Sequence, residues 1–407
     1  MNTVSFIILT ACLGSLGASC AVGSPPTLEP QGITAALPSP DPPSPHRFCG
    51  WLTSGADQAA AEEAYDTFEA HAGELDAVHP TWWRVASPTT FANHPEDGSA
   101  PYHGFHDPRV LRHTTPGGGR TRLMPLIAAT HRSETLDVHR MINDPDLRRR
   151  HVEALVALVT ENAYDGLDLD YEHIDPDHLA QDFSPGQDGA TEAAALTAFV
   201  SEAARALHAV GKTLSLAVPV RVDPPNPVFD YDALSSAADT LHVMAYDYHY
   251  EGGPHAGPLS PLGWVEATIA DVLSVDGGRR ASKFVLGLPN YGVIGPEVGP
   301  GGYGFARVCE PSSACLALTA GAYETATKHM DHCDQGERQY LSGRVPNAVL
   351  PGGEHLFFED LASLEERVSA AERAGLGGIT TWGIGGEPVG PSGRTYFEMV
   401  RDHFPRR

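Results

Sequence analysis

The chain has 407 residues, of which 42% are hydrophobic and 8% aromatic, and this composition is typical of a globular protein with a sizeable core. Lys and Arg total 27 against 52 Asp and Glu, so the net charge is −25. A charge of this sign repels polyanions, and we therefore expect neither nucleic acid nor an anionic membrane surface as a partner.

The N-terminal residues are predicted to serve export and attachment. The apolar run VSFIILTACLGSL is too short to cross a membrane and has the length of a signal-peptide core. Cys12 and Cys20 each follow a small residue, as a lipid-attachment cysteine does. Residues 1–20 therefore predict an exported protein that is either secreted or lipid-anchored at the bacterial cell envelope. Residues 21–46 contain eight prolines and are typical of an extended tether.

Short apolar runs rich in β-branched residues recur over residues 47–407, where we expect the folded domain. In chain order they are FCGWL, VHPTWWRVAS, RLMPLIAAT, GLDLDYE, TLSLAVPVRV, TLHVMAYDY, KFVLGLP and GGITTWGI. Helical periodicity fills most of the gaps, in particular residues 56–72, 144–162, 191–210, 264–273 and 360–374. Eight strands that alternate with helices predict an α/β protein with a (β/α)8 TIM barrel. An open sheet is disfavoured because no glycine-rich dinucleotide fingerprint follows the first strand.

Two gaps between the predicted strands are longer than one helix requires. Residues 87–120 are rich in Pro, Gly and His and predict a long loop, and residues 291–358 leave room for a small α+β insertion between strands seven and eight. Beyond the signal region an even number of cysteines remains, which is compatible with disulfides in an exported protein. Their pairing stays open; these cysteines are Cys49, Cys309, Cys315 and Cys333.

The fourth predicted strand, in the run YDGLDLDYEHID, is unusually acidic. Alternate residues of a strand share a face, so Asp168, Asp170 and Glu172 point into the barrel while the leucines between them face the helices. Like charges and desolvation both raise carboxyl pKa values, so at least one of the three is expected to hold or share a proton. Glu172 lies at the C-terminal end of the strand, where barrels carry their active sites, and a protonated carboxyl there suits a general acid.

Other uses of these acids are less well supported. A calcium loop starting at Asp168 would have His173 where glycine is required. Ion pairing is limited because the neighbouring strands offer few inward cations, Arg84 and Arg221 being the candidates. The cluster YHGFHD completes no zinc-like spacing, and with 20 histidines in the chain such clusters arise by chance. We therefore expect no metal and no cofactor.

The run D-G-L-D-L-D-Y-E resembles the D-x-x-D-x-D-x-E signature of glycoside hydrolase family 18. M-A-Y-D-Y on the sixth strand resembles the family's Met-x-Tyr-Asp element, and the resemblance extends over the chain from about Arg47. It implies that Glu172 is the general acid and base, and that Asp170 orients the substrate's 2-acetamido group and stabilises an oxazolinium ion. Asp168 would hydrogen-bond Asp170 and share its proton. This is substrate-assisted retention, an exception to the two-carboxylate rule.

The resemblance also assigns residues that bind the sugar. Tyr246 would donate a hydrogen bond to the acetamide oxygen, Asp247 would contact the same sugar, and Trp382 would form the floor of a subsite. Trp51 would either line the sugar groove or pack inside the barrel. The side chain of Asp165 points to the opposite face of the strand from Asp168, Asp170 and Glu172. It is therefore expected to stabilise the start of the strand.

Several local features are similar to the bacterial branch of the family that acts on peptidoglycan and spore cortex, among them PTWWRV, RLMPLIAA and LGLPNYG. The expected partner is a polysaccharide or oligosaccharide containing N-acetylglucosamine, with no obligate protein partner. One alternative is a catalytically silent lectin on the same barrel, although such members usually lose the acid that Glu172 supplies here. Another is a metal-dependent barrel hydrolase such as a deacetylase, which the absence of a histidine pair disfavours.

Overall fold

The computed structural model describes most of the chain beyond the expected signal and tether. The described residues are 47–53, 58–93, 104–114, 121–175, 179, 188–222, 225–250, 257–295, 307–309, 324–325, 343–344, 346–350, 353–385 and 387–406. The signal peptide, the tether, Cys315 and Cys333 fall outside these ranges. Among the described residues, no helix combines the length and apolar character that crossing a membrane requires.

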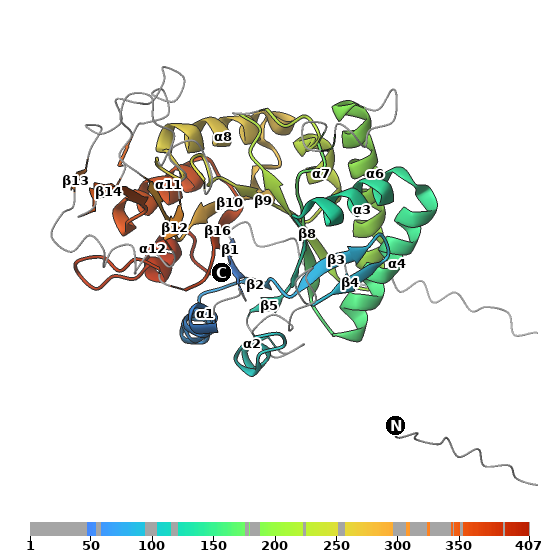
Figure 1. Cartoon of the computed structure of the whole chain (residues 1–407), viewed down its shortest axis with the longest axis horizontal. Helices are drawn as coiled ribbons and strands as arrows, with labels where there is room; N and C mark the ends of the chain where they lie inside the picture. The colour runs from blue at the N-terminus through green and yellow to red at the C-terminus, as the bar shows by residue number, and fades with distance from the viewer. Residues whose placement is uncertain are drawn as a thin grey trace, which may run out of the picture. The chain divides into compact units, whose positions relative to one another are not determined.

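Ten of the eleven strands of the main sheet occupy eight positions around a barrel, as the sequence predicts (Figure 1). Strand two bends into two segments, strand three does the same around Pro125, and β4 (Thr90–Ala92) is an antiparallel addition. The barrel closes because β1 pairs in parallel with both β2 and β16. In order the barrel strands are β1 (Arg47–Leu52), β2 (Ala77–Pro80) with β3 (Trp83–Ser87), β5 (Arg122–Leu123) with β6 (Leu126–Ala129), β7 (Gly166–Tyr171), β8 (Thr213–Pro219), β9 (Thr240–Met244), β10 (Phe284–Pro289) and β16 (Gly378–Trp382).

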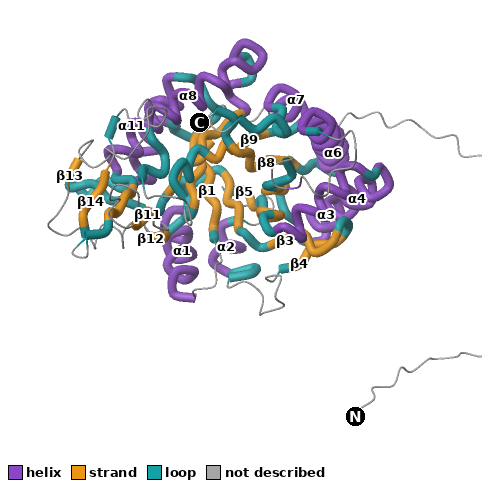
Figure 2. The backbone as a smooth tube through the Cα atoms, turned by 45° about the horizontal axis from the view of Figure 1, so that its top comes forward, coloured by secondary structure: helices purple, strands orange, loops and turns teal. Residues whose placement is uncertain are grey.

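Helices surround the strands (Figure 2). The helix predicted over residues 144–162 forms as α4, and its start is fixed by Asp144, whose side chain accepts from the backbone N–H groups of Asp146 and Leu147. The described helices are α1 (Gln58–His71), α2 (Pro108–His113), α3 (Arg132–Asn143), α4 (Pro145–Glu161), α6 (Gly189–Ala209), α7 (Tyr231–Ala237), α8 (Leu262–Ser274), α11 (Leu361–Arg373) and α12 (Tyr396–His403), with 3-10 turns η1 (Val275–Gly278) and η2 (Ala281–Lys283).

Alternation along the strands separates two apolar regions. On β1, Phe48 and Leu52 belong to the large core beneath the helices, whereas Cys49 and Trp51 lie in small clusters inside the barrel. On β7 the outward side chains likewise join the large core, and Asp168 is fully buried on the inner side. The inward direction predicted for the acids is therefore confirmed for this strand.

An antiparallel sheet lies between β10 and β16, where the sequence predicts an insertion. Its strand order is β12-β11-β15-β14-β13, and β11 and β15 pair in the middle of the sheet. Cys309 is the last residue of β12. The five strands are β11 (Gly292–Gly295), β12 (Arg307–Cys309), β13 (Glu324–Thr325), β14 (Pro346–Val349) and β15 (His355–Phe358).

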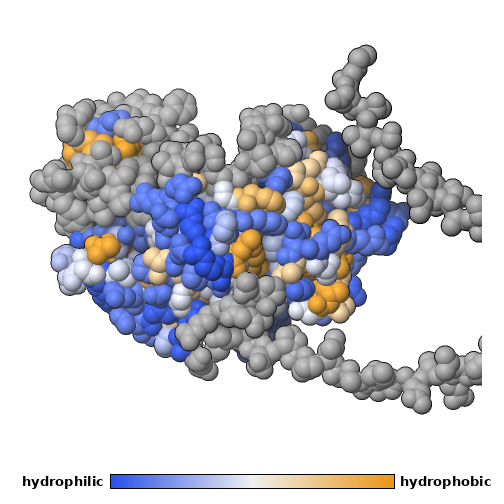
Figure 3. Space-filling view, turned by 90° about the horizontal axis from the view of Figure 1, so that it is seen from below, coloured by the Kyte–Doolittle hydropathy of each residue, from blue (hydrophilic) through white to orange (hydrophobic). Residues whose placement is uncertain are grey.

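Hydrophilic residues cover most of the described surface on the face drawn in Figure 3, with hydrophobic residues in small separate groups. This distribution is typical of a folded domain that buries most of its large apolar side chains.

Candidate active site

The three alternate carboxylates of β7 differ in depth. The exposed fraction is 0% for Asp168 and 5% for Asp170. The Glu172 side chain, just beyond the end of the strand, is 29% exposed. Its backbone N–H donates to the Ala129 carbonyl at 3.1 Å, which continues the pairing of β7 with β6. Of the three acids, Glu172 is therefore accessible at the C-terminal end of β7, and the other two are kept inside the barrel.

Asp168 is held from several strands at once. The Trp51 indole N–H donates to Oδ2 at 2.8 Å, and the Ser215 hydroxyl donates to Oδ1 at 2.6 Å. Nδ1 of His79 and Nδ1 of His242 lie 3.9 Å and 3.4 Å from its carboxylate oxygens. Burial alone would raise the pKa of Asp168, but the charges of His242 and His79 overcome burial and hold this pKa well below its usual range. Asp168 is therefore ionised.

Asp170 has the opposite electrostatic character. Burial raises its pKa well above the usual value, and the negative charges of Glu172 and Asp168 raise it further, while Arg84 opposes them. The sequence leads us to expect this direction for at least one acid of the strand. Oδ1 of Asp170 is buried and has no hydrogen-bond partner among the described residues. The bond between Asp168 and Asp170 that the resemblance implies is not formed in this part of the structure, since Asp168 accepts from Trp51 and Ser215 instead.

Aromatic side chains pack beside these acids. The ring centroids of Trp51 and Trp382 lie 5.6 Å apart, and those of Tyr246 and Trp382 lie 6.4 Å apart with the planes inclined by 22°. Trp382 is half-buried, so part of its ring remains accessible, whereas Trp51 is fully buried. Of the two roles weighed for Trp51, the structure places it in barrel packing, where its N–H group also anchors Asp168.

Tyr246 and Asp247 follow the end of β9, which is separated from β7 by β8 alone. Burial raises the pKa of Tyr246 well above its usual value, and the charges of Asp170 and Glu172 raise it further, so the phenol keeps its proton. Asp247 has a positive φ of 60°, and the Tyr291 hydroxyl donates to its Oδ1. The backbone turn at Asp247 sets the direction in which the side chains of Tyr246 and Asp247 extend from the end of β9.

The start of β7 is held by Asp165, as its strand parity leads us to expect. Its Oδ2 accepts from the Leu123 backbone N–H at 2.8 Å, and its own N–H donates to the Leu123 carbonyl at 2.8 Å. Both contacts tie β7 to β5 at the end of the barrel opposite Glu172.

Arg84 lies near the acids but is paired. Its Nε and Nη2 donate to the Glu134 carboxylate at 2.5 Å and 2.6 Å, and Nη2 also donates to the Thr130 hydroxyl at 2.9 Å. A cavity of about 350 Å³ opens beside this ion pair, between β3 and α3, with Asp137 also in its wall. The cavity adds a polar recess next to the site.

The histidines that neighbour Asp168 are not predicted from the sequence. The inward cations are His79 and His242, whereas Arg221 pairs with Asp271 at 2.9 Å and Arg84 with Glu134. Arg84 and Arg221, the candidate inward cations, thus each pair with a carboxylate outside β7. Strand parity contains the signal, because His242 shares its inward parity with Met244 and Tyr246.

Comparison with known families decides the affiliation. Residues 120–387, well over half of the chain, match the model described as glycosyl hydrolases family 18. The chain belongs to this family. The matched region contains the acidic strand, the Met-x-Tyr-Asp element and Trp382, so the resemblance read from these motifs is confirmed at the level of family.

Similar proteins include a cortical fragment-lytic enzyme and a chitotriosidase. The chain is 23% identical over 281 residues to the cortical fragment-lytic enzyme of Bacillus subtilis, covering 68% of this chain and 59% of that protein. It is 24% identical over 272 residues to chitotriosidase-1 of Mus musculus, covering 60% of this chain and 53% of that protein. The chain thus spans little more than half the length of these two relatives.

Solved structures confirm the barrel. A chitinase from Chromobacterium violaceum superposes with a TM-score of 0.66 at 18% identity, covering 89% of this chain and all of that one. At this identity the likeness concerns the fold. The predicted (β/α)8 architecture is confirmed by it and by the strand pairing described above.

Proposed function

We propose that the chain is a retaining glycoside hydrolase that cleaves β-linked N-acetylglucosamine glycans with help from the substrate's own acetamide. One observation carries the proposal. A partly exposed Glu172 lies two residues after a buried Asp170, whose Oδ1 has no hydrogen-bond partner among the described residues. An unsatisfied buried acceptor is costly unless a ligand completes it. The N–H group of a 2-acetamido substituent is a donor of the required kind.

In the proposed reaction Glu172 donates its proton to the glycosidic oxygen while the bond to the anomeric carbon breaks. The acetamide oxygen attacks that carbon from the opposite face and forms an oxazolinium ion, which the carboxyl group of Asp170 orients and stabilises. Glu172, now ionised, takes a proton from water, and the water oxygen opens the ring with net retention. Ionised Asp168 supplies negative potential beneath Asp170, since it raises the pKa of that neighbour.

The remaining groups bind the sugar in this proposal. Tyr246 keeps its proton and can donate to the acetamide oxygen, and Asp247 contacts the same sugar. Trp382 offers a ring face to a pyranose, because carbohydrate C–H groups pack well on aromatic faces. Trp51 acts from below by fixing Asp168 rather than by touching sugar.

The substrate class in the proposal is peptidoglycan or chitin. The relatives named above include a cortex-lytic enzyme and a chitotriosidase, so both glycans are represented among similar proteins. The strongly negative net charge favours a neutral glycan over a polyanion. Export, by secretion or lipid anchoring at the cell envelope, is part of the same proposal, because both polymers lie outside the cytoplasm.

A substrate panel tests the activity. Chitooligosaccharides, purified peptidoglycan and a high-mannose glycopeptide are incubated separately with the protein, and the products are analysed by mass spectrometry. We expect cleavage after N-acetylglucosamine in at least one of the first two. Binding of all glycans without any cleavage would identify a lectin instead.

A second experiment tests substrate assistance. A thiazoline analogue of the oxazoline intermediate is expected to inhibit strongly, because ligands that resemble intermediates bind more tightly than substrates. A substrate with hydroxyl in place of the 2-acetamido group is expected to bind but hardly react. Covalent labelling of Asp170 or Glu172 by a 2-fluoro sugar, with the thiazoline inert, would replace this mechanism with a protein nucleophile.

A further inference from the structure

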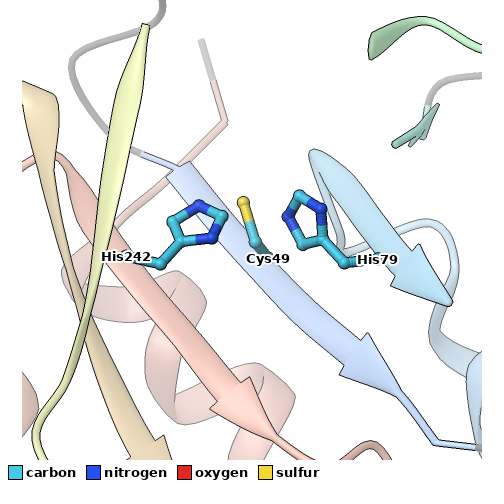
Figure 4. Close-up of side chains that lie close together, drawn as sticks. All are labelled: Cys49, His79 and His242. Atoms are coloured by element: carbon cyan, nitrogen blue, oxygen red, sulfur yellow. The ribbon is translucent and has the colours of Figure 1, made fainter. Parts of the chain in front are cut away.

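Three side chains capable of binding a metal meet inside the barrel, next to Asp168. They are Cys49 on β1, His79 on β2 and His242 on β9, with exposed fractions of 2%, 1% and 1%. One potential ligand atom from each lies within 4.8 Å of the others. Figure 4 shows the thiol between the two imidazole rings.

The hydrogen bonding of the two histidines leaves ligand atoms available. Nδ1 of His79 lies 2.9 Å from the Met124 carbonyl, so this nitrogen is the donor, and a metal at Nε2 would take the place of the second proton that charges the ring. Nε2 of His79 and Nδ1 of His242 are both buried and have no hydrogen-bond partner among the described residues. Histidines that bind a metal typically donate their other ring N–H to a backbone carbonyl or carboxylate, as His79 does here.

We propose that Cys49, His79 and His242 form a buried site for a thiophilic divalent transition metal, with Zn²⁺ as the ion that fits the ligands. One thiolate and two imidazoles are a ligand set that Zn²⁺ accepts in four-coordinate sites. Zinc bonds of about 2.0 to 2.3 Å bring ligand atoms closer together than 4.8 Å, so binding requires side-chain shifts of about an ångström and no change of strand register.

A carboxyl group borders the cluster. Oδ1 of Asp168 lies 3.4 Å from Nδ1 of His242, so an oxygen ligand, or a hydrogen-bond acceptor for one of the ligands, is within reach of an ion at this position. The ligands come from three strands. Two of these strands, β1 and β2, pair with each other, and Trp51 on β1 is the pairing partner of His79 on β2. A bound ion would link these strands to β9 across the barrel. His242 contacts Asp168, but none of the three ligands is among the groups proposed to bind sugar, so the site does not depend on the proposed function.

Metal content and spectroscopy test the site in the full chain. The protein is purified without chelator, and zinc is counted by mass spectrometry; we expect about one ion per chain. Replacement by Co²⁺ is expected to produce a thiolate-to-cobalt charge-transfer absorption that Cys49→Ser abolishes. His208→Gln, an exposed histidine on α6, serves as the control and is expected to keep both the ion and the absorption.

Stability measurements keep the test decisive if Cys49→Ser does not fold. The melting temperature of the unmodified protein is expected to fall on prolonged chelation and to recover with Zn²⁺, because an ion that binds only the folded state stabilises it. Zinc content below about a tenth of an equivalent after incubation with Zn²⁺, or an unchanged melting temperature, would overturn the proposal. So would Co²⁺ spectra that are the same in Cys49→Ser and the unmodified chain.

Discussion

Glu172 is the carboxyl group of β7 that solvent and substrate can reach, and it follows two buried acids along the strand. Replacing it by Gln keeps the shape of the side chain and removes the transferable proton. We expect Glu172→Gln to lower kcat by about 10²- to 10⁴-fold, which is the usual contribution of general acid–base catalysis. The rate is measured on the glycan that the substrate panel identifies.

The control for this change is Glu161→Gln, at the exposed end of α4, which is expected to keep full activity. Sugar binding and the circular dichroism spectrum of Glu172→Gln should match those of the unmodified protein. A variant at position 172 that retained more than about a tenth of the rate would remove Glu172 from the catalytic role.

Asp170 makes the folded protein sensitive to pH. Its pKa is raised by burial and by the charges of Glu172 and Asp168, so the unfolded chain releases this proton at lower pH than the folded protein does. The contribution of Asp170 to stability is therefore lost as pH rises above about 3.9, the ordinary pKa of Asp. We expect Asp170→Asn to be more stable than the unmodified protein at pH 7, as measured by urea unfolding, while its turnover falls.

The gain should disappear when the same measurement is made below about pH 4, where Asp170 is protonated in both states. An equal difference in stability at both pH values would mean that packing, and not ionisation, separates the two proteins.

The bond between Trp51 and Asp168 connects β1 to β7 across the inside of the barrel. Trp51→Phe removes the N–H donor and leaves a buried charge with one partner fewer. Since hydrogen bonds to charged groups contribute about 1.5–3 kcal/mol, we expect the free energy of unfolding to drop by at least that amount. Denaturant titration followed by circular dichroism measures it.

Trp264→Phe provides a matched control on α8. Trp264 is also buried, but its Nε1 has no hydrogen-bond partner among the described residues, so the change removes ring area without removing a bond. Equal destabilisation by the two substitutions would show that the bond to Asp168 contributes nothing measurable.

His151 on α4 contacts Tyr171 on the outer face of β7, and this histidine is expected to make the stability of the fold depend on pH. His151 is fully buried, with Nε2 2.8 Å from the Tyr171 hydroxyl and Nδ1 2.9 Å from the Pro88 carbonyl. Burial lowers the pKa of His151 to about 4 from an ordinary value of 6.5. The stability that neutral His151 provides is complete above pH 6.5 and is lost as pH falls towards 4.

We expect the free energy of unfolding to decrease by up to about 1.4 kcal/mol per pH unit in this window on account of His151. His151→Gln cannot titrate and should show a shallower dependence when urea unfolding is repeated at several pH values. Identical slopes for the two proteins would place the acid sensitivity elsewhere in the chain.

The barrel strands are predictable from sequence because each is a short apolar run between helices, and the helix over residues 144–162 forms within one residue of both predicted ends. The loop predicted over residues 87–120 contains α2, which the sequence did not reveal because its six residues are too few to show helical periodicity. The acids of β7 are predictable since parity orients them. Their partners are not, because Ser215, His79 and His242 come from other strands and only tertiary packing brings them to Asp168.

The net charge of −25 makes a prediction for the whole molecule. A neutral chitooligosaccharide has no long-range electrostatic interaction with the protein, so kcat/KM should change by less than about two-fold between low and high salt. A partly deacetylated, cationic oligosaccharide of the same length is attracted by the acidic surface, and its KM should rise with salt. A strong salt effect on the neutral substrate would reveal a charged step in recognition.

The antiparallel insertion leaves and re-enters the barrel at one place, because Gly292 on β11 pairs with Phe358 on β15. The length of chain between these paired ends therefore has little effect on the barrel, since the entropy of closing a loop rises only slowly with its length. An evolving lineage can enlarge, shrink or replace this segment while the register of β10 and β16 stays intact. The acids of β7 thus keep their positions whatever the length of this segment.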